Sequence, residues 1–374
     1  MVLLKIFWER IVDNIYRMII INARFLTQKL TGVQRFAMEL CLQMKEKLDS
    51  NVQFVAPYNI IHVEIAEQLG VVVIGKRIGH LWEQIDLPMY LKVRGNPILL
   101  CLGNTAPVFY YNKISTLHDI MFIRYPKTFS FKFRMMYGIL IPKVLSTSKH
   151  LFTVSGFSKK EICDYYSVNP NKVTIIYNAV NGMFHRIIDN SLGKEKYLIT
   201  VSSLKESKNF IMAYKAFKSA RKYVEGLKLY IIGDVKTGSF NDMDVFVSQL
   251  QQDEDVVLLG RVADDELIRF YSNALAFIFP SLYEGFGIPV LEAQACGCPV
   301  ISSNSSALPE VLGDSAILCN PTKENDFTKA IIRIAQDKVM SESLVRRGYE
   351  NVKRFSWEKS AEYMRDIIRL YDKY

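Results

Sequence analysis

The sequence predicts an α/β chain built from two doubly wound parallel sheets, each in its own domain. Short apolar runs alternate with amphipathic helical patterns along nearly all of the 374 residues, which is typical of βαβ units. The alternation pauses at residues 185–196 (HRIIDNSLGKEK), a polar stretch that contains Gly193. A chain of this length is also long for one core and comfortable for two.

The elements follow in order along the chain. In the first half we expect strands at residues 18–22, 52–56, 71–74, 98–102, 115–118, 151–154 and 173–176, with helices at 33–48, 80–93, 129–145 and 158–166. In the second half we expect strands at residues 197–201, 228–232, 256–259, 275–279, 299–302 and 316–319. The predicted domains are residues 18–188 and 189–355. An extension at 1–17 precedes them, and a helix at 356–374 follows, with apolar residues at helical spacing.

The extension at residues 1–17 places its apolar side chains on one helical face: Leu4, Phe7, Trp8, Ile11, Val12 and Ile15. Three interpretations stay open. The extension is interpreted as a helix lying in a membrane interface, as a helix docked on the protein's own surface, or as a stretch translated from an upstream start codon, with Met18 as the usual first residue. It is too short to span a bilayer.

Composition and charge narrow the class of function. The net charge is +9, and residues 1–190 carry 23 Lys and Arg against 13 Asp and Glu, so the first half suits an anionic membrane or a phosphorylated acceptor. Nucleic-acid motifs are lacking, as is a Gly-x-Gly-x-x-Gly fingerprint, which argues against a dinucleotide dehydrogenase. No apolar run approaches the roughly 18 residues of a membrane span. Six scattered cysteines and five histidines without metal-ligand spacing predict a cytoplasmic protein with reduced thiols and no metal.

The most informative stretch reads FPSLYEGFGIPVLEAQACGCPVIS, from residue 279 to 302. A strand runs into a loop that holds Glu284, Gly285 and Gly287, and Pro289 then opens a short helix that carries Glu292. Glycines before a helix start allow close approach of a ligand, and the N–H groups there favour an anion. A carboxylate on each side could accept hydrogen bonds from sugar or ribose hydroxyls. Taken alone, the stretch could equally be an ordinary βαβ turn with two solvated glutamates.

The pattern E-G-F-G-I-P-x-L-E-A-x-A-C-G-x-P-V resembles the signature of the retaining GT-B glycosyltransferases, specifically glycosyltransferase family 4. The resemblance implies the GT-B fold: two Rossmann-like domains facing a cleft, with a C-terminal helix that crosses back to the first domain. It also implies a metal-independent enzyme without a cofactor. Glu284 would hold the hexose, Glu292 the ribose, and the amides around Gly285, Phe286, Gly287 and Ile288 the diphosphate.

Further segments resemble other elements of this family. Lys208, in the segment at 201–209, would grip the diphosphate, but Ser203 stands where the family usually has an arginine; Lys205 or backbone amides could compensate. Gly32, in Thr31-Gly-Val-Gln-Arg35, would face the donor phosphates, and His118 would lie beside the hexose. Arg261 and Val262 belong to the segment that holds the nucleobase. Asn178, which resembles a further cleft element, is interpreted as a turn residue.

The resemblance predicts a retaining hexosyltransferase that acts on surface polysaccharide, O-antigen or capsule. The donor is a GDP- or UDP-linked hexose, with GDP-mannose the first choice, and the acceptor is a glycan or a lipid-linked glycan. The enzyme is expected in the cytoplasm, in peripheral contact with the inner face of the membrane. Two alternatives remain open: a non-catalytic sugar-nucleotide-binding subunit that supports a partner transferase, and a GT-B sugar-nucleotide epimerase.

Overall fold

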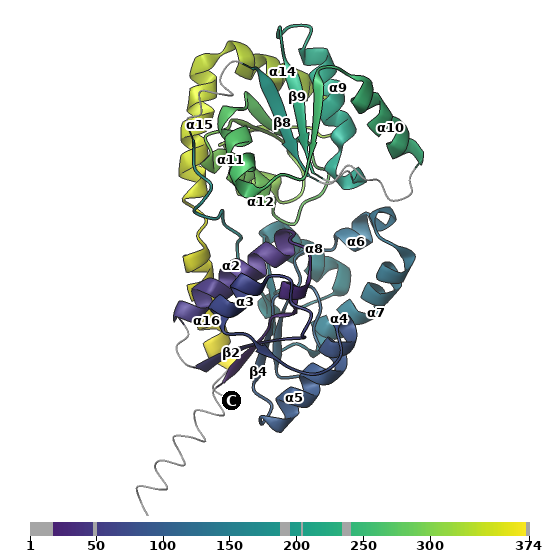
Figure 1. Cartoon of the computed structure of the whole chain (residues 1–374), viewed down its shortest axis with the longest axis vertical. Helices are drawn as coiled ribbons and strands as arrows, with labels where there is room; N and C mark the ends of the chain where they lie inside the picture. Colours follow the sequence, from purple (N-terminus) through teal and green to yellow (C-terminus); the bar gives the residue numbers. More distant parts are fainter. Residues whose placement is uncertain (1–17, 48–50, 188–194, 203–204, 234–240, 372–374) are drawn as a thin grey trace, which may run out of the picture. The chain divides into compact units, whose positions relative to one another are not determined.

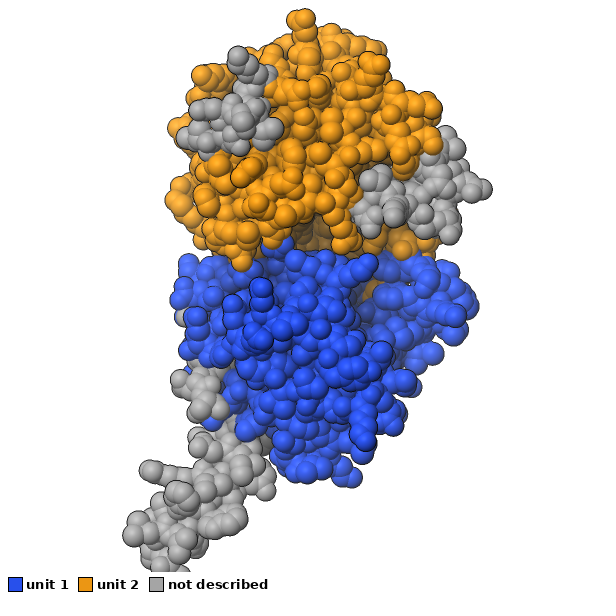
Figure 2. Space-filling model, viewed as in Figure 1, with its two compact units in different colours: residues 1–120, 129–178, 356–374 blue, residues 121–128, 179–355 orange. Residues whose placement is uncertain are grey.

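The computed structural model describes residues 18–47, 51–187, 195–202, 205–233 and 241–371 (Figure 1). The chain divides into two compact units, coloured in Figure 2. The first comprises Met1–Ile120, Phe129–Asn178 and Ser356–Tyr374, and the second Met121–Thr128 and Ala179–Phe355. The predicted extension at 1–17, Ser203 and most of the polar stretch at 185–196 lie outside the described residues.

The first unit is built on a seven-stranded parallel sheet in the order β3-β2-β1-β4-β5-β6-β7. Its strands are β1 (Ile19–Asn22), β2 (Val52–Ala56), β3 (Val72–Val73), β4 (Ile98–Cys101), β5 (Lys113–Thr116), β6 (His150–Thr153) and β7 (Val173–Ile175). In the register, Ile20 of β1 lies opposite Gln53 of β2 and Leu99 of β4. Both faces are covered by helices, which explains the continuous apolar strands.

The helices of the first unit are η1 (Arg24–Thr27), α2 (Gly32–Lys47), α3 (Val63–Leu69), α4 (Gly79–Leu81), η3 (Trp82–Asp86), α5 (Leu87–Val93), α7 (Phe131–Thr147), α8 (Gly156–Tyr166), η5 (Pro170–Lys172) and α16 (Trp357–Tyr371). α16 packs against α2, and the rings of Phe36 and Trp357 meet edge to face at 6.1 Å (Figure 1). η3, α5 and α7 share one core cluster, to which they contribute Trp82, Leu87 and Val144.

The second unit holds a six-stranded parallel sheet in the order β10-β9-β8-β11-β12-β13. Its strands are β8 (Tyr197–Val201), β9 (Lys228–Ile232), β10 (Val256–Gly260), β11 (Ala276–Phe279), β12 (Val300–Ser303) and β13 (Ile317–Cys319). Its helices are α6 (Met121–Arg124), η4 (Pro126–Thr128), η6 (Glu206–Lys208), α9 (Phe210–Ala220), α10 (Asn241–Gln252), α11 (Asp264–Asn273), α12 (Ile288–Ala295), α13 (Leu308–Leu312), α14 (Glu324–Gln336) and α15 (Lys338–Val352).

Alternate residues of β11 point to the two faces of the second sheet. Ala276 and Ile278 join the core under α9, α10 and α14, whereas Phe277 lies on the other face, where it meets Tyr271 of α11 at 5.3 Å. In both sheets the strand order reverses in the middle, at β1/β4 and at β8/β11. The predicted α/β class with two doubly wound sheets is therefore confirmed.

The fifth strand begins two residues earlier than predicted. Lys113 opens it and is completely buried, because its Nζ donates to the carbonyl of Tyr110 at 2.6 Å and to Thr147 Oγ1 at 2.7 Å. Burial lowers the pKa of Lys113 to about 8. Lysine is seldom buried unless it is paired, and here the carbonyl of Tyr110 and the hydroxyl of Thr147 supply the partners.

Candidate functional site

An ion pair joins two predicted site residues of the second unit. Lys208 Nζ lies 2.6 Å from Glu284 Oε1, and the two side chains are only 16% and 9% exposed. Lys208 follows β8 and Glu284 follows β11, so the pair lies at the carboxyl ends of the two strands between which the strand order reverses. Open α/β sheets bind ligands at this point.

Backbone contacts fix Lys208. Ser207, beside it, is buried, and its carbonyl accepts a hydrogen bond from the N–H of Leu282 at 2.7 Å. Asn209 adopts the left-handed conformation (φ 54°), which asparagine tolerates better than most residues. Its Nδ2 donates to the carbonyls of Pro280 and Pro321, at 3.1 and 2.9 Å. The β8–α9 connection is thereby tied to the loop that carries Glu284.

Serine hydroxyls hold the Glu284 loop from the other side. The N–H of Glu284 donates to Ser306 Oγ at 2.9 Å, and the Ser305 hydroxyl donates to the carbonyls of Ser281 and Leu282 at 3.0 and 3.2 Å. The Ser303 hydroxyl also donates to the carbonyl of Ser281. Because these hydrogen bonds already order the loop of Glu284, the carboxylate loses little conformational entropy when it binds a ligand.

The helix α12 begins where the sequence predicted it, with Pro289 in its first turn. Gly287, the N-cap residue, has φ 99°, and a Cβ there would lie 2.9 Å from Leu308 Cδ2 and 3.8 Å from Phe279 Cε1. The ring of Phe279 also lies 5.7 Å from Lys208 Nζ. The start of α12 and the lysine therefore border the same aromatic side chain.

The start of α12 is suited to an anion. The first N–H groups of a helix lack partners within the helix, and Gly287 offers no side chain to accept from them. The helix dipole adds partial positive charge at this end. Glu292 lies one turn into α12 and is 6% exposed. A cation, a helix start and two carboxylates together match the charges and hydroxyl groups of a sugar diphosphate.

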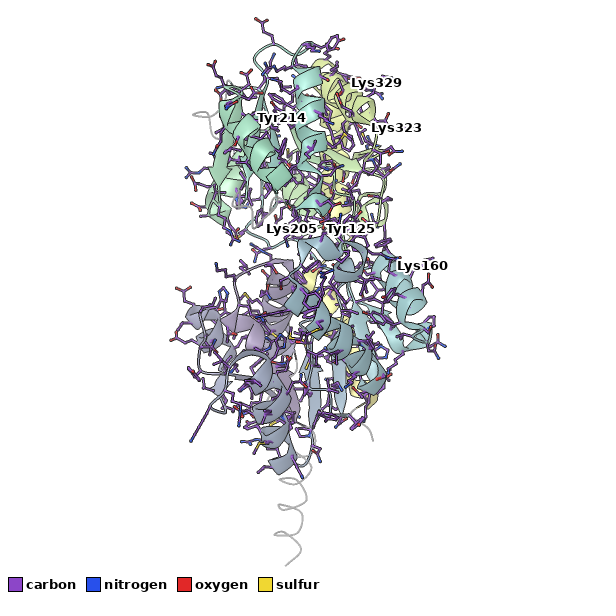
Figure 3. The ribbon with its side chains drawn as sticks, turned by 90° about the vertical axis from the view of Figure 1, so that its right-hand side faces the viewer. Tyr125, Lys160, Lys205, Tyr214, Lys323 and Lys329 are labelled. Atoms are coloured by element: carbon purple, nitrogen blue, oxygen red, sulfur yellow. The ribbon has the colours of Figure 1, made fainter. Side chains whose placement is uncertain are left out.

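Tyr125 was missed from the sequence. Its segment, Met121–Thr128, groups with the second unit, and its ring lies 5.9 Å from that of Tyr283, next to Glu284. Figure 3 labels Tyr125 beside Lys205. Burial, and then the charge of Glu206, raise the pKa of the Tyr125 hydroxyl. A lone tyrosine between two short helical turns carries no sequence signal.

Arg261 and Val262 follow β10, the edge strand of the second sheet. Gly260, before them, has φ 68°, and its carbonyl accepts from the N–H of Gly233 at 2.7 Å. Arg261 is exposed and Val262 is half-buried. One strand, β9, lies between β10 and β8, so within this sheet the two residues lie apart from the Lys208–Glu284 pair.

In the first unit, His118 is buried after the end of β5. Its Nε2 lies 3.0 Å from the carbonyl of Leu102, and its ring meets Phe36 edge to face at 4.8 Å. Burial lowers the pKa of His118 to about 4, although the hydrogen bond to Leu102 opposes this. The imidazole is therefore neutral near pH 7, and its Nε2–H donates to the carbonyl. Its Nδ1 is then a hydrogen-bond acceptor.

Two other predicted residues lie in turns of the first unit. Gly32 is exposed and opens α2, directly after Thr31, whose hydroxyl donates to Gln34 Oε1 at 2.5 Å. Asn178 follows β7 and is 3% exposed; among the residues that the structure describes, its Oδ1 has no hydrogen-bond partner. A buried carbonyl oxygen of this kind can accept from a hydroxyl of a ligand.

A buried charged cluster, which was not predicted from the sequence, lies at the β1/β4 reversal. Glu83, only 1% exposed, accepts from Asn22 Nδ2 at 2.9 Å, Arg24 Nε at 3.2 Å and Thr105 Oγ1 at 2.7 Å. Burial opposes its ionisation, but Arg24, His80 and Thr105 outweigh burial and lower the pKa of Glu83 to about 2. Asn22 ends the strand predicted at residues 18–22 and Arg24 follows it, so both could have been noticed; Glu83 lies in a helix.

Comparisons with known proteins extend this picture. Residues 184–351 match the family model of "Glycosyl transferases group 1". This segment is therefore similar to group 1 glycosyl transferase domains. It contains Lys208, Glu284, Gly287 and Glu292, and so nearly all of the predicted donor site.

Similarity to whole proteins covers most of the chain. The O-antigen chain mannosyltransferase RfbU of Salmonella typhimurium is 28% identical over 332 residues, 85% of this chain and 91% of that protein. The O-antigen chain mannosyltransferase B of Escherichia coli is 27% identical over 255 residues, 66% and 67% of the two chains. The crystal structure of Anabaena Alr3699/HepE in complex with UDP and glucose matches with a TM-score of 0.71 at 15% identity, over 94% and 99% of the chains. The fold is GT-B.

Within the described part of the chain, no helix is long and apolar enough to cross a membrane. Among the same residues, no group of three or more His, Cys, Asp and Glu side chains is arranged to hold a metal ion.

Proposed function

We propose that the protein is a retaining hexosyltransferase that moves mannose from GDP-mannose to a glycan or lipid-linked glycan during synthesis of a surface polysaccharide such as O-antigen. The observation that carries this proposal is the Lys208–Glu284 ion pair, 2.6 Å long and nearly buried, beside the start of α12. The two O-antigen mannosyltransferases among the relatives support mannose and the acceptor class. The UDP and glucose named with the Anabaena structure support a nucleotide-linked sugar donor.

In this proposal the ion pair divides when the donor binds. Lys208 turns its ammonium to the diphosphate, together with the N–H groups from Gly285 to Ile288, and Glu284 accepts hydrogen bonds from hexose hydroxyls. Glu292 accepts from the ribose hydroxyls, and Arg261 and Val262 border the nucleobase. Before the donor binds, Lys208 and Glu284 neutralise each other, so neither nearly buried charge lacks a partner. When the donor binds, a phosphate becomes the partner of Lys208 and a sugar hydroxyl the partner of Glu284.

The chemical step is a displacement at the anomeric carbon. The bond from this carbon to the diphosphate breaks, a bond to the acceptor oxygen forms on the same face, and the leaving phosphate oxygen takes the acceptor proton. Lys208 and the helix start stabilise the charge that develops on the leaving diphosphate. In the first unit, Gly32 lies beside the donor phosphates, and Nδ1 of neutral His118 accepts a hydrogen bond from a sugar hydroxyl. No metal ion or cofactor takes part.

The test is a panel of GDP- and UDP-linked hexoses with lipid-linked saccharide acceptors, read by nucleoside diphosphate release. NMR of the product gives its anomeric configuration. We expect release only with donor and acceptor together, best with GDP-mannose, and an α-linked product. An inverted product would refute retention. Donor binding without release would favour the non-catalytic subunit, and conversion of the donor without an acceptor would favour the epimerase.

A further inference from the structure

The first unit carries an exposed apolar face made by two neighbouring helical segments. The first segment runs through α4, η3 and α5, where every fourth residue is apolar and between 37% and 85% exposed: Leu81, Ile85, Met89 and Val93. The second is α7, where Phe131, Met135 and Ile139 are 55–68% exposed at the same spacing. Residues four apart lie on one side of a helix, so each set forms a ridge.

The two ridges face away from the same side of the sheet. Leu87 and Leu91 of α5 and Val144 of α7 belong to one core cluster, so both helices bury their opposite sides against this face. Figure 1 shows α4, α5 and α7 together along one edge of the first unit. We name the exposed surface of Leu81, Ile85, Met89, Val93, Phe131, Met135 and Ile139 the two-ridge face.

The part of the chain that carries the two-ridge face is strongly basic. Residues 70–160 carry 13 Lys and Arg against 3 Asp and Glu, a net charge of +10 that accounts for the excess of the whole chain. None of the three acids is exposed: Glu83 and Asp86 are buried, and Asp119 is half-buried. On the two segments themselves, the exposed basic residues are Lys92, Lys132, Arg134 and Lys143.

We infer that the two-ridge face lies on a bilayer that contains anionic lipid. Apolar side chains flanked by Lys and Arg, with no exposed carboxylate, are the composition of helices that lie in the membrane interface. The long basic side chains can reach the headgroups while the ridges enter the acyl boundary. A second copy of the chain fits less well, because it would oppose the same positive charge. The inference rests on the proposed function only for its purpose, which is to bring the enzyme to a lipid-linked acceptor.

Flotation of the full chain with vesicles tests the inference. We expect binding to phosphatidylcholine vesicles with about one third phosphatidylglycerol, weaker binding to pure phosphatidylcholine, and loss of binding as salt screens the charges. Met89→Glu with Met135→Glu should reduce binding at least on the order of tenfold, since it places charge at the apolar contact. Lys132→Ala with Lys143→Ala should reduce it on the order of fivefold per lysine.

Matched controls come from the second unit. Val339→Glu with Tyr223→Glu changes two hydrophobic residues that are at least as exposed as Met89 and Met135, and Lys323→Ala with Lys329→Ala removes two exposed lysines (Figure 3). Both controls should bind as the unaltered chain does. If the variants of the two-ridge face also bind fully, the inference is wrong and other residues carry the membrane contact.

Two further measurements separate the remaining outcomes. If light scattering shows a dimer that Met89→Glu with Met135→Glu dissociates, and vesicles are not bound, the face is a contact between copies and the inference is overturned. Thermal shift with GDP and UDP reports on the second unit without any vesicle. Every variant should keep that shift, so failure of membrane binding and failure of the proposed donor site are distinguishable.

Discussion

Removing the lysine of the ion pair should separate its contribution to stability from its contribution to catalysis. In Lys208→Met the aliphatic packing remains, but Glu284, 9% exposed, loses its cation. Breaking a buried pair from one side costs roughly 3 kcal/mol, at the low end of the range because Lys208 keeps some exposure. If the second unit unfolds by itself, this cost lowers its melting temperature by about 6–12 °C. Turnover should fall on the order of 10² to 10³-fold with the loss of a donor to the leaving group.

The double variant gives the decisive comparison. Glu284→Gln in the Lys208→Met background removes the unpaired charge, so it should recover most of the lost melting temperature but none of the turnover. Trp82 and Trp357 both lie in the first unit, and the second unit has no tryptophan, so the fluorescence transition should stay unchanged while the circular dichroism transition moves. Wild-type turnover in either variant, or recovery of turnover together with stability, would refute this reasoning.

Three further predictions test other parts of the account. The pKa of His118 is about 4 against roughly 6.5 in an unfolded chain, so its contribution to stability, at most about 3 kcal/mol, is fully present above pH 6.5 and is lost as the pH falls toward 4. Urea unfolding followed by tryptophan fluorescence should show this loss of stability, and His118→Asn should make the stability depend less on pH. His150, whose pKa burial also lowers to about 4, contributes between the same pH values in both proteins. If the variant loses as much stability per pH unit as the unaltered chain, His118 is not responsible. Gly287→Ala should lower the free energy of unfolding by about 1–2 kcal/mol, because φ is 99° and the new Cβ meets Leu308. It should also weaken nucleoside diphosphate binding in calorimetry. Unchanged stability and binding would contradict a close approach of the diphosphate to Gly287. Ser203→Arg restores the residue that family 4 usually has. It should tighten nucleoside diphosphate binding on the order of tenfold in the same assay, since a charge-assisted hydrogen bond contributes about 1.5 kcal/mol or more. Weaker binding would show that this chain holds the diphosphate differently.

Much of the fold could be predicted because most strands are short, mainly apolar runs between helical patterns. Burial on both faces requires such runs. Of the 13 strands in the described residues, 12 lie within one residue of their predicted bounds, and β5 begins two residues early, at Lys113. Its ammonium is satisfied by the carbonyl of Tyr110 and by Thr147, a partner 34 residues away. Local sequence pattern carries no information about such a partner.

The candidate site, too, could be predicted only in part. The sequence placed Lys208 and Glu284 after two strands and predicted the start of α12, because glycine and proline mark the turn locally. It could not show that the two side chains form an ion pair, since they are 76 residues apart and meet only through the pairing of β8 with β11. Glu83 and Tyr125 were missed for a related reason: each lies in a helical or irregular segment, and each gains its position from contacts made after folding.

Hydrogen exchange with a nucleoside diphosphate tests the central claim most directly. GDP or UDP should slow amide exchange in two places, the Glu284 loop with the first turn of α12 and the segment around Lys208, and Lys208→Met should abolish this protection. Protection confined to other segments, with the amides from 284 to 292 exchanging as before, would contradict it.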